Sequence, residues 1–312
     1  MNNSISISII APIYGVENYI EKFADSVLSQ SYQNIEFIFV NDGTKDNSMS
    51  VLNGLIDSKF SHLKDKIKII NKQNGGLPAA RRTGLDAATS DYVYHVDSDD
   101  WLAPDSIKKI VDEIERTSSD IVYFNLVKEY PDRSKVKRQK AYSSEQREQF
   151  IRDIYNHRAA ASVCNKCFRR SLFLDHTIHT PQYGYAEDCY LTTQLIGYAK
   201  TICYLDADIY HYRKGNPGAL TAQKHRKRKK EYALNFIDLY EKYCDLPRKE
   251  NPVGCIIDDI VMQIGWYSIL YNFKFFRQYP WLKSAVGKAE IRRGSDVWVP
   301  LQLLTKLIAR FL

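Results

Sequence analysis

The sequence predicts an α/β fold in which a mostly parallel sheet carries helices on both faces, followed by a helical C-terminal region. Short runs of β-branched and aromatic residues alternate with stretches whose apolar residues recur at helical spacing. Strands that alternate with helices are joined by right-handed crossovers and pair in parallel. Beyond Thr221 the strand pattern stops, and aromatic-rich stretches with a helical pattern take its place.

Strands are expected over residues 5–11, 35–40, 67–70 and 92–96. Helices are expected between and after these strands, and each shows an apolar stripe that we interpret as core. The stripes are Ile20, Phe23, Ala24, Val27 and Leu28; Val51, Leu52, Leu55 and Ile56; the segment 79–88; and Ile107, Ile110, Val111 and Ile114, which follow a helix start at Pro104-Asp105.

The charge of the chain is unevenly distributed. Residues 1–220 contain 27 Lys and Arg against 28 Asp and Glu, whereas residues 221–312 contain 17 against 9. We therefore expect one domain over 1–220, with halves at 1–105 and 106–220, and a basic, aromatic-rich helical region over 221–312. A chain of 312 residues is long enough for one large α/β core with such an appendage.

The composition, with 44% apolar and 26% charged residues, is typical of a globular protein. The longest apolar stretch, Gly254 to Leu270, is interrupted by Asp258 and Asp259, so no membrane span is expected. The N-terminus lacks a basic segment followed by an apolar block, and the six cysteines lack regular spacing. These features predict a cytoplasmic protein with free thiols and no zinc site.

Three carboxylates, in the segment Asp97-Ser98-Asp99-Asp100, directly follow the expected strand 92–96. The carboxyl ends of the strands are where open α/β sheets bind their ligands. Carboxylate oxygens are the ligands that Mg²⁺ and Mn²⁺ prefer, so a divalent cation is predicted here. The alternative is a polar turn that only ends the strand, since Asp and Ser are ordinary turn residues.

Other polar residues are expected at the same edge of the sheet. Asp42 follows the second strand and could accept hydrogen bonds from the ribose or base of a nucleotide, or serve only as a turn former. The segment 74–84 places glycines and Arg81 where they could approach and grip phosphate oxygens, although solvated arginines are the alternative. Of the later acidic pair Glu187-Asp188, one member could act as a general base.

Several short motifs follow one another along the chain. They are IIAPIYGVENY (9–19), VNDG (40–43), NGGLPAAR (74–81), VDSDDW (96–101), CNKCFRRSLF (164–173), AED (186–188), YHYR (210–213) and ALT (219–221). This series resembles glycosyltransferase family 2, inverting enzymes with a GT-A fold, which is Rossmann-like. Residues 5–105 resemble the nucleotide-binding half, and the resemblance extends over roughly the first 220 residues into the acceptor-side half of bacterial members.

The resemblance implies roles for individual residues. Pro12, Tyr14 and Glu17 would border the nucleotide, and Asp42 would contact its base. Asn74 and Arg81 would lie beside the nucleotide and phosphates, and Asp97, with Ser98 grouped with it, would contact the ribose or sugar. Asp99 would ligate the metal, and Asp188 would deprotonate the acceptor hydroxyl. A cation such as Arg81 or Arg213 would stabilise the leaving phosphate. His211 could add a metal or phosphate contact near Arg213, and a solvated or structural histidine is the alternative.

The sequence departs from the family pattern at three positions. Gly15 stands where Asn is usual, Pro78 where Ser is common and Arg82 where Asn is common. The departures bear on loop geometry and donor preference, not on the class of reaction.

The expected function is metal-dependent, inverting transfer of a sugar from a nucleotide donor, most simply UDP-linked, to a saccharide or lipid-linked saccharide hydroxyl in polysaccharide or lipopolysaccharide synthesis. Direct displacement needs one base and no covalent nucleophile, so inversion is expected. One alternative is a sugar-nucleotide pyrophosphorylase, but the loop after the first strand, residues 11–19, has no basic residue. The other alternative is a nucleotide-sugar-binding subunit without catalysis.

The C-terminal region is predicted to hold the enzyme against the inner face of the cytoplasmic membrane. A basic run, 224–230, would attract anionic lipid, and the aromatic residues between 266 and 281 would favour the interface. Leu301, Leu304, Leu307, Ile308 and Phe311 fall at helical spacing, with Lys306 and Arg310 for the polar side. The alternative is a helical subdomain that buries these aromatics. Nucleic-acid binding is not expected, since no recognised fold accompanies the basic run.

Overall fold

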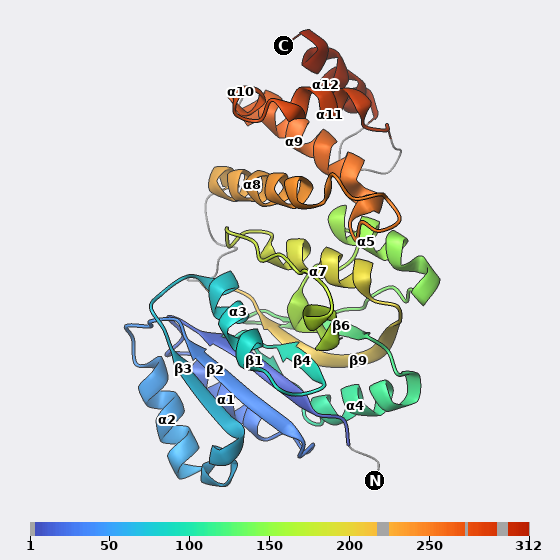
Figure 1. Cartoon of the computed structure of the whole chain (residues 1–312). Coiled ribbons are helices and arrows are strands. Elements are labelled where there is room, and N and C mark those ends of the chain that lie inside the picture. Colours follow the sequence, from blue (N-terminus) through green and yellow to red (C-terminus); the bar gives the residue numbers. More distant parts are fainter. Residues whose placement is uncertain (1–3, 217–224, 272–273, 292–298, 312) are drawn as a thin grey trace. The chain divides into compact units, whose positions relative to one another are not determined.

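The computed structural model describes residues 4–216, 225–271, 274–291 and 299–311 (Figure 1). Its contacts divide the chain into two compact units. Unit 1 comprises Met1–Glu145, Ser162–Thr180 and Tyr198–Ala222, and unit 2 comprises Gln146–Ala161, Pro181–Gly197 and Gln223–Leu312. The grouping differs from the domains predicted from charge, because two segments within 106–220 belong with the C-terminal helices.

Residues 1–105 of unit 1, predicted to be the nucleotide-binding half, contain the expected parallel strands. They are β1 (Ile7–Ile13), β2 (Ile35–Asn41), β3 (Ile67–Asn71) and β4 (Tyr92–His95). They lie in the order β3-β2-β1-β4, and all three pairings are parallel (Figure 1). The carboxyl ends of these strands therefore meet at one edge, as the polar loops require.

Helices cover both faces of this part of the sheet. α1 (Ile20–Leu28) packs on one face, where Phe23 meets Phe39 of β2 edge-on. α3 (Leu77–Ala87) packs on the other face, where a Cβ atom at Gly84 would lie 2.3 Å from Ile10 Cγ2 and 3.3 Å from Val40 Cγ2. Phe39 and Val40 are consecutive in a strand and so point to opposite faces. Glycine at position 84 is what permits the close approach of α3.

Two further helices follow the predicted stripes. α2 (Ser48–Ser58) buries Leu52 and Ile56, and α4 (Ser106–Thr117) buries the four apolar residues of its stripe. A 3₁₀ helix, Ser61–Lys66, leads into β3. These elements confirm the α/β pattern expected from the sequence.

The remainder of unit 1 extends the sheet with mixed pairing. β5 (Trp101–Leu102), β6 (Ile121–Glu129), β7 (Ser134–Lys137), β8 (Lys166–Arg169) and β9 (Ile202–Arg213) continue the order as β4-β8-β6-β9-β5, with β7 on β6. β8 is antiparallel to β4 and β6, β9 is parallel to β6, and β5 is antiparallel to β9. Short helices, Val163–Asn165 and α6 (Ser171–Leu174), flank β8.

Unit 2 is helical, as expected for the C-terminal region. A 3₁₀ turn (Ser144–Gln146) at the end of the first segment of unit 1 leads into α5 (Arg147–Tyr155) of unit 2. The other elements of unit 2 are α7 (Glu187–Tyr198), α8 (His225–Tyr243), a 3₁₀ turn (Gly254–Ile256), α9 (Ile257–Tyr271), α10 (Phe275–Gln278), α11 (Trp281–Lys288) and α12 (Val299–Phe311). None of the helices in the described residues is long and apolar enough to span a membrane.

α12 buries polar side chains and leaves leucines exposed. Gln302 and Thr305 are buried, whereas Leu303 is 53% and Leu304 is 42% exposed. The buried side packs closely on α9, where a Cβ atom at Gly265 would lie 3.0 Å from Thr305 Cγ2. Such a close approach favours a small side chain at the interface over a leucine. The side chains of Leu307 and Phe311 lie outside the described residues.

Candidate active site

The Asp97–Asp100 loop is fixed at the edge where β1 and β4 end. The Val96 amide donates to the Ile10 carbonyl oxygen at 3.0 Å, which continues the pairing of β4 with β1. The buried Ser98 hydroxyl then donates to the Pro12 carbonyl oxygen at 2.6 Å. Ser98 and Pro12, both predicted to lie at the nucleotide site, therefore join the two strand ends directly. This bond is a structural role that the sequence pattern alone does not reveal.

Arg81 and Asp97, both predicted to lie at the nucleotide site, form an ion pair. Arg81 projects from α3 with only 4% of its surface exposed, and its Nη2 lies 2.8 Å from Asp97 Oδ1. Guanidinium and carboxylate form a charge-assisted hydrogen bond in this geometry. The pair ties α3 to the loop and places a positive charge beside the acidic segment.

Asp99 is half-buried and has partners from the end of β9 and from the residues just after it. Asn216 Nδ2 donates to Asp99 Oδ2 at 2.7 Å, and Arg213 Nε donates to the Asp99 carbonyl oxygen at 2.9 Å. Burial, followed by the negative charge of Asp97, raises the pKa of the Asp99 carboxyl. A site that penalises negative charge in this way is one where an added cation is favourable.

Asp100 is the buried member of the cluster, only 1% exposed, and it fixes the loop to β9. It accepts hydrogen bonds from the Tyr210 hydroxyl at 2.6 Å and from the Arg213 amide at 2.7 Å. Burial and the charge of Asp99 raise its pKa well above the usual range. The Tyr210 oxygen in turn accepts from the Asp97 amide at 3.1 Å. Sequence reasoning missed this structural role because Tyr210 is remote in the chain.

Arg213 lies among aromatic rings next to the loop. Its guanidinium carbon is 4.8 Å from the Tyr19 ring centroid and 5.0 Å from that of Trp101. Lys22 Nζ stands 3.1 Å from the Trp101 centroid, and burial followed by the charge of Arg213 lowers its pKa. Two cations thus contact the Trp101 ring, directly after the Asp97–Asp100 loop. Tyr19 and Trp101 belong to the motifs used in the sequence analysis, whereas nothing in the sequence singled out Lys22.

His211 has a different environment from that of the predicted metal ligand. Its Nδ1 lies 2.7 Å from Glu129 Oε1, and its ring stacks on Trp101 at 5.2 Å between centroids. Trp101 and His211 are paired across β5 and β9, which brings the rings together. We therefore leave His211 out of the proposed metal site and assign it to the support of Trp101.

Asp42 organises the loop before α3. Its carboxylate, 3% exposed, accepts hydrogen bonds from Lys72 Nζ at 2.6 Å and from the amides of Gly75 and Gly76 at 2.9 and 2.8 Å. All three donors come from the segment on either side of Asn74, which is exposed. The structure thus gives Asp42 a role in shaping this segment, and its contact with a base stays a prediction.

The loop after β1 holds Tyr14 and Glu17. Tyr14 is 56% exposed, while Glu17 Oε2 accepts from the Asn47 amide at 3.0 Å. Gly15 has φ +68° and donates its amide to Thr44 Oγ1 at 2.9 Å. Glycine and asparagine are the residues that adopt this left-handed conformation most readily, which explains how Gly15 can stand where the family pattern has Asn.

Asp188 belongs to unit 2, in the first turn of α7. A helix N-terminus stabilises a carboxylate through the unpaired amides and the helix dipole. Ala186, the residue directly before α7, has φ +65°, a costly conformation for a residue with a Cβ atom. The segment before it is held by the buried Asn235 of α8, whose Nδ2 donates to the carbonyl oxygens of Tyr183 and Tyr185 at 3.0 and 2.9 Å. α8 therefore fixes the approach to α7.

The acidic loop fits a divalent cation that is shared with a substrate. In the ranges described, no three His, Cys, Asp or Glu side chains are grouped to hold a metal ion by themselves. Mg²⁺ typically binds through one or two carboxylates together with substrate phosphates and water. Asp97 and Asp99 offer oxygen ligands only, and the raised pKa of Asp99 marks a place where positive charge is favoured.

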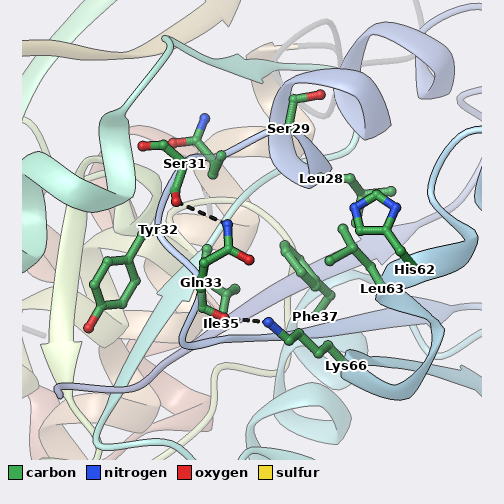
Figure 2. Close-up of a pocket in the computed structure, with 11 residues that line it drawn as sticks. Leu28, Ser29, Ser31, Tyr32, Gln33, Ile35, Phe37, His62, Leu63 and Lys66 are labelled. Atoms are coloured by element: carbon green, nitrogen blue, oxygen red, sulfur yellow. Dashed lines mark hydrogen bonds between the residues drawn. The ribbon is translucent and has the colours of Figure 1, made fainter.

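A pocket of about 270 Å³ lies elsewhere in unit 1 (Figure 2). It is lined by the segments that precede β2 and β3, including Tyr32, Gln33, His62 and Lys66. Lys66 Nζ donates to the Gln33 carbonyl oxygen at 2.6 Å across it. The pocket therefore lies at the amino ends of the strands, away from the edge that carries the acidic loop, and we do not assign the candidate site to it.

Comparisons with known proteins agree with this architecture. The model of the family described as glycosyl transferase family 2 matches residues 8–177, more than half of the chain. The chain belongs to glycosyltransferase family 2. It is 28% identical over 217 residues to the putative glycosyltransferase EpsH of Bacillus subtilis, covering 67% of this chain and 60% of that protein. It is 31% identical over 240 residues to glycosyltransferase GlyA of Streptococcus pneumoniae, covering 70% and 32%.

The chain thus spans less than two thirds of the length of these relatives. Among solved structures, TarS 1–349 of S. aureus in complex with UDP-GlcNAc matches with a TM-score of 0.65 at 18% identity, over 98% of this chain and 89% of that one. The mannosyltransferase PcManGT of Pyrobaculum calidifontis, in complex with GDP-Man and Mn²⁺, matches with a TM-score of 0.55 at 15% identity, over 99% and 81%. These likenesses establish the GT-A fold.

Proposed function

We propose that the protein is a metal-dependent, inverting glycosyltransferase that moves a sugar from a nucleotide donor to a saccharide hydroxyl. The observation that carries the proposal is the Asp97–Asp100 loop, fixed to β1 through Ser98 and to β9 through Asp100, with Arg81 and Arg213 bonded to it. Acidic and basic groups held rigidly together at the carboxyl edge suit a diphosphate whose charge is shared between a cation and arginine.

Each residue of the site has a distinct task in this reaction. Asp99, assisted by Asp97, holds the divalent cation. When bound, the cation neutralises negative charge that develops on the leaving diphosphate. Arg213 adds a fixed positive charge, because its guanidinium is bonded to the Asp99 carbonyl oxygen and covered by Tyr19 and Trp101. Asp188 removes the proton from the attacking hydroxyl, and direct displacement inverts the anomeric carbon.

The donor is proposed to be UDP-linked. TarS has been solved with UDP and with UDP-GlcNAc, which supports this choice, whereas PcManGT was solved with GDP-Man. A panel of UDP- and GDP-sugars, screened for Mn²⁺-dependent hydrolysis, identifies the donor. Turnover with GDP-sugars alone contradicts the assignment of UDP.

The central experiment compares wild type with Asp99→Ala, with and without Mn²⁺ or Mg²⁺. We expect hydrolysis and transfer to require the metal and to fall by about 10²-fold or more in the variant, as for the loss of one group that stabilises developing charge. Asp112→Ala, which removes an exposed carboxylate of α4 paired with Lys108, is the matched control and keeps full activity. Undiminished turnover without metal or without Asp99 contradicts the proposal.

The acceptor is proposed to be a saccharide or lipid-linked saccharide of a bacterial surface glycan, such as capsule or lipopolysaccharide. The names of the relatives support transfer in general but not a particular acceptor. A catalytically inactive binding subunit is the alternative. Donor binding measured by calorimetry, combined with no transfer to a cell-envelope extract, would favour that alternative over the enzyme.

We also propose that unit 2 associates with an anionic membrane on the cytoplasmic side. Lys227, Lys229 and Lys230 on α8 are exposed, and Leu303 and Leu304 of α12 are exposed apolar side chains. Several of the aromatics first assigned to the interface are not available, since Phe275 and Phe276 are buried and Trp281 stacks on Tyr240.

Flotation with vesicles of anionic lipid at low salt tests this association. Binding is expected for wild type and is expected to be lost when the three lysines are replaced by Gln. Leu303→Ser combined with Leu304→Ser tests the apolar contribution separately. Absence of binding by the full-length protein, or equal binding by all variants, rules the association out.

A further inference from the structure

Three half-buried lysines lie on one face of the sheet in unit 1. Lys128 is on β6, Lys137 is on the neighbouring β7, and Lys214 directly follows β9. Lys137 pairs with Leu126, two residues before Lys128, so both lysines point to the same face. We name these three residues the lysine cluster.

Lys214 joins this face through Tyr212. Tyr212 pairs with Lys128 across β9 and β6 and therefore shares its face. Lys214 Nζ lies 4.4 Å from the centroid of the Tyr212 ring. The cluster thus spans the three adjacent strands β7, β6 and β9.

The three amines interact with one another without a neutralising partner. Burial, followed by the positive charge of Lys128, lowers the pKa of Lys137. Burial lowers the pKa of Lys214, and Lys128 and Lys137 lower it further, against an opposing effect of Asp100. Within the described part of the chain, no carboxylate is within ion-pair distance of these amines. Half-buried positive charges that lie close together repel one another, so this arrangement is unfavourable without an anion.

The nearest carboxylate in sequence does not serve the cluster. Glu129 points to the opposite face of the sheet, where its oxygens bond to His211 and to the Ser134 hydroxyl. The cations on that opposite face, Lys22 and Arg213, therefore have an acidic neighbour, and Glu129 indeed raises the pKa of Lys22. For the lysine cluster, the opposing effect on Lys214 comes instead from Asp100, which is not within ion-pair distance.

The cluster borders the acidic loop on the side away from the nucleotide strands. Tyr210 lies on the same face as Tyr212 and bonds to Asp100 and to the Asp97 amide. The strand order places β6, β7 and β9 beyond β4 and β8, whereas the proposed nucleotide site lies at the ends of β1, β2 and β4. The cluster is therefore carried by other strands than the proposed nucleotide site.

We propose that the lysine cluster binds a phosphate group carried by the acceptor. Three ammonium groups provide point charges suited to phosphate oxygens, and a phosphate would relieve their mutual repulsion. The inference rests on the proposed function, since it names the chemistry of the acceptor of that reaction. The other source of phosphate is the donor's diphosphate, and the experiment separates the two.

The test uses inorganic pyrophosphate as the probe and calorimetry on the full-length protein in EDTA, so that no metal site contributes. Pyrophosphate is expected to bind wild type and to bind at least roughly tenfold more weakly when Lys128, Lys137 and Lys214 are replaced by Gln, because charge-assisted contacts are lost. Lys109→Gln, which removes one exposed lysine of α4, is the control for loss of a surface positive charge and leaves binding unchanged. Equal binding by wild type and the triple variant overturns the proposal.

Saturating UDP then distinguishes the two sources. Pyrophosphate binding that survives UDP supports an acceptor site, and binding that UDP abolishes assigns the cluster to the donor and overturns the proposal. The binding measurement needs no turnover, so it can be made even if the protein transfers no sugar. A protein that binds pyrophosphate through these lysines but shows no transfer would contradict the proposed function and not the anion site. In an active protein, the triple variant raises KM for a phosphorylated acceptor but not for its dephosphorylated counterpart.

Discussion

Asn235 and Tyr183 form a two-way hydrogen-bonded pair within unit 2. The Tyr183 amide donates to Asn235 Oδ1 at 3.2 Å, and Asn235 Nδ2 donates back to the Tyr183 carbonyl oxygen at 3.0 Å. The side chain of Asn235 is 1% exposed, so the pair is shielded from water. It fixes the segment that leads through Ala186 into the first turn of α7. The C-terminal helix α8 is therefore part of what positions Asp188, and not an appendage.

Replacing Asn235 by Ala is expected to lower kcat while donor binding stays intact. The change leaves half-buried residues Tyr183 and Tyr185 without the hydrogen-bond partner of their backbone groups, which costs about 1 kcal/mol or more of unfolding free energy. Thermal unfolding, kcat and the Kd for the donor are the measurements. Asn53→Ala, at an exposed position of α2, serves as the control. Unchanged kcat in a destabilised Asn235→Ala would limit Asn235 to a role in folding.

Asp188→Asn is expected to abolish most transfer, by about 10²–10⁴-fold, because the amide cannot accept the proton of the attacking hydroxyl. Binding of the nucleotide donor is expected to match wild type. Glu187→Gln is the neighbouring control in the same helical turn and should retain activity. If the two variants exchange these outcomes, the base is Glu187 and not Asp188.

Tyr210→Phe is expected to loosen the acidic loop. The change removes the hydroxyl that donates to the buried Asp100 and accepts from the Asp97 amide. Loss of this donor to Asp100 lowers the free energy of unfolding by about 1–3 kcal/mol. The Kd for UDP measured with Mn²⁺ is expected to rise, because the loop that is proposed to hold the cation is no longer fixed. Tyr130→Phe, in the turn between β6 and β7, controls for the loss of a tyrosine hydroxyl. Wild-type unfolding temperature and wild-type affinity in Tyr210→Phe would show that the loop does not depend on this bond.

Asp120 provides a pH-dependent contribution to stability. Burial alone would raise its pKa, but the amides of Lys200 and Thr201 and the guanidinium of Arg169 outweigh burial and lower it. A depressed pKa in the folded state stabilises the protein above the unfolded pKa, near pH 4, and this stabilisation is lost as the pH falls through the folded value.

Asp120→Asn should therefore be less stable than wild type at pH 7, by about 1–2 kcal/mol, with a gap that narrows toward pH 2–3. Denaturant unfolding of both proteins across this range measures the gap. Asp132→Asn, at an exposed position, is the control and shows little difference at any pH. A gap that is constant with pH would mean that ionisation of Asp120 makes no contribution.

The first part of the fold could be predicted because each of its elements is marked locally. The runs that became β1, β2 and β4 are buried and end in polar loops, and α1 and α4 carry continuous apolar stripes. Alternation of strand and helix then implies parallel pairing. β8 and β9 carry no such regular pattern. The antiparallel pairing of β8 with β4 and β6 also does not follow from alternation of strand and helix.

The site could be predicted only as far as its residues act locally. The acidic loop and Arg81 come from compact motifs, and the structure brings Arg81 to Asp97. The role of Asp100 depends on Tyr210, and the setting of His211 depends on Glu129, and both partners are remote in sequence. The orientation of α12 likewise depends on the close approach at Gly265, which no periodicity can reveal.

The interleaved division of the chain has a consequence for the order of synthesis. Segments of unit 2 at Gln146–Ala161 and Pro181–Gly197 leave the ribosome before the helices that begin at His225. The hydrogen bonds between Tyr183 and Asn235, which fix the start of α7, therefore cannot form until α8 has been synthesised. The strands β1 to β4 can pair before that. Premature termination near residue 220 is expected to release a nascent chain with a formed nucleotide half and an unsupported Asp188, a species that exposes apolar surface and is prone to aggregate.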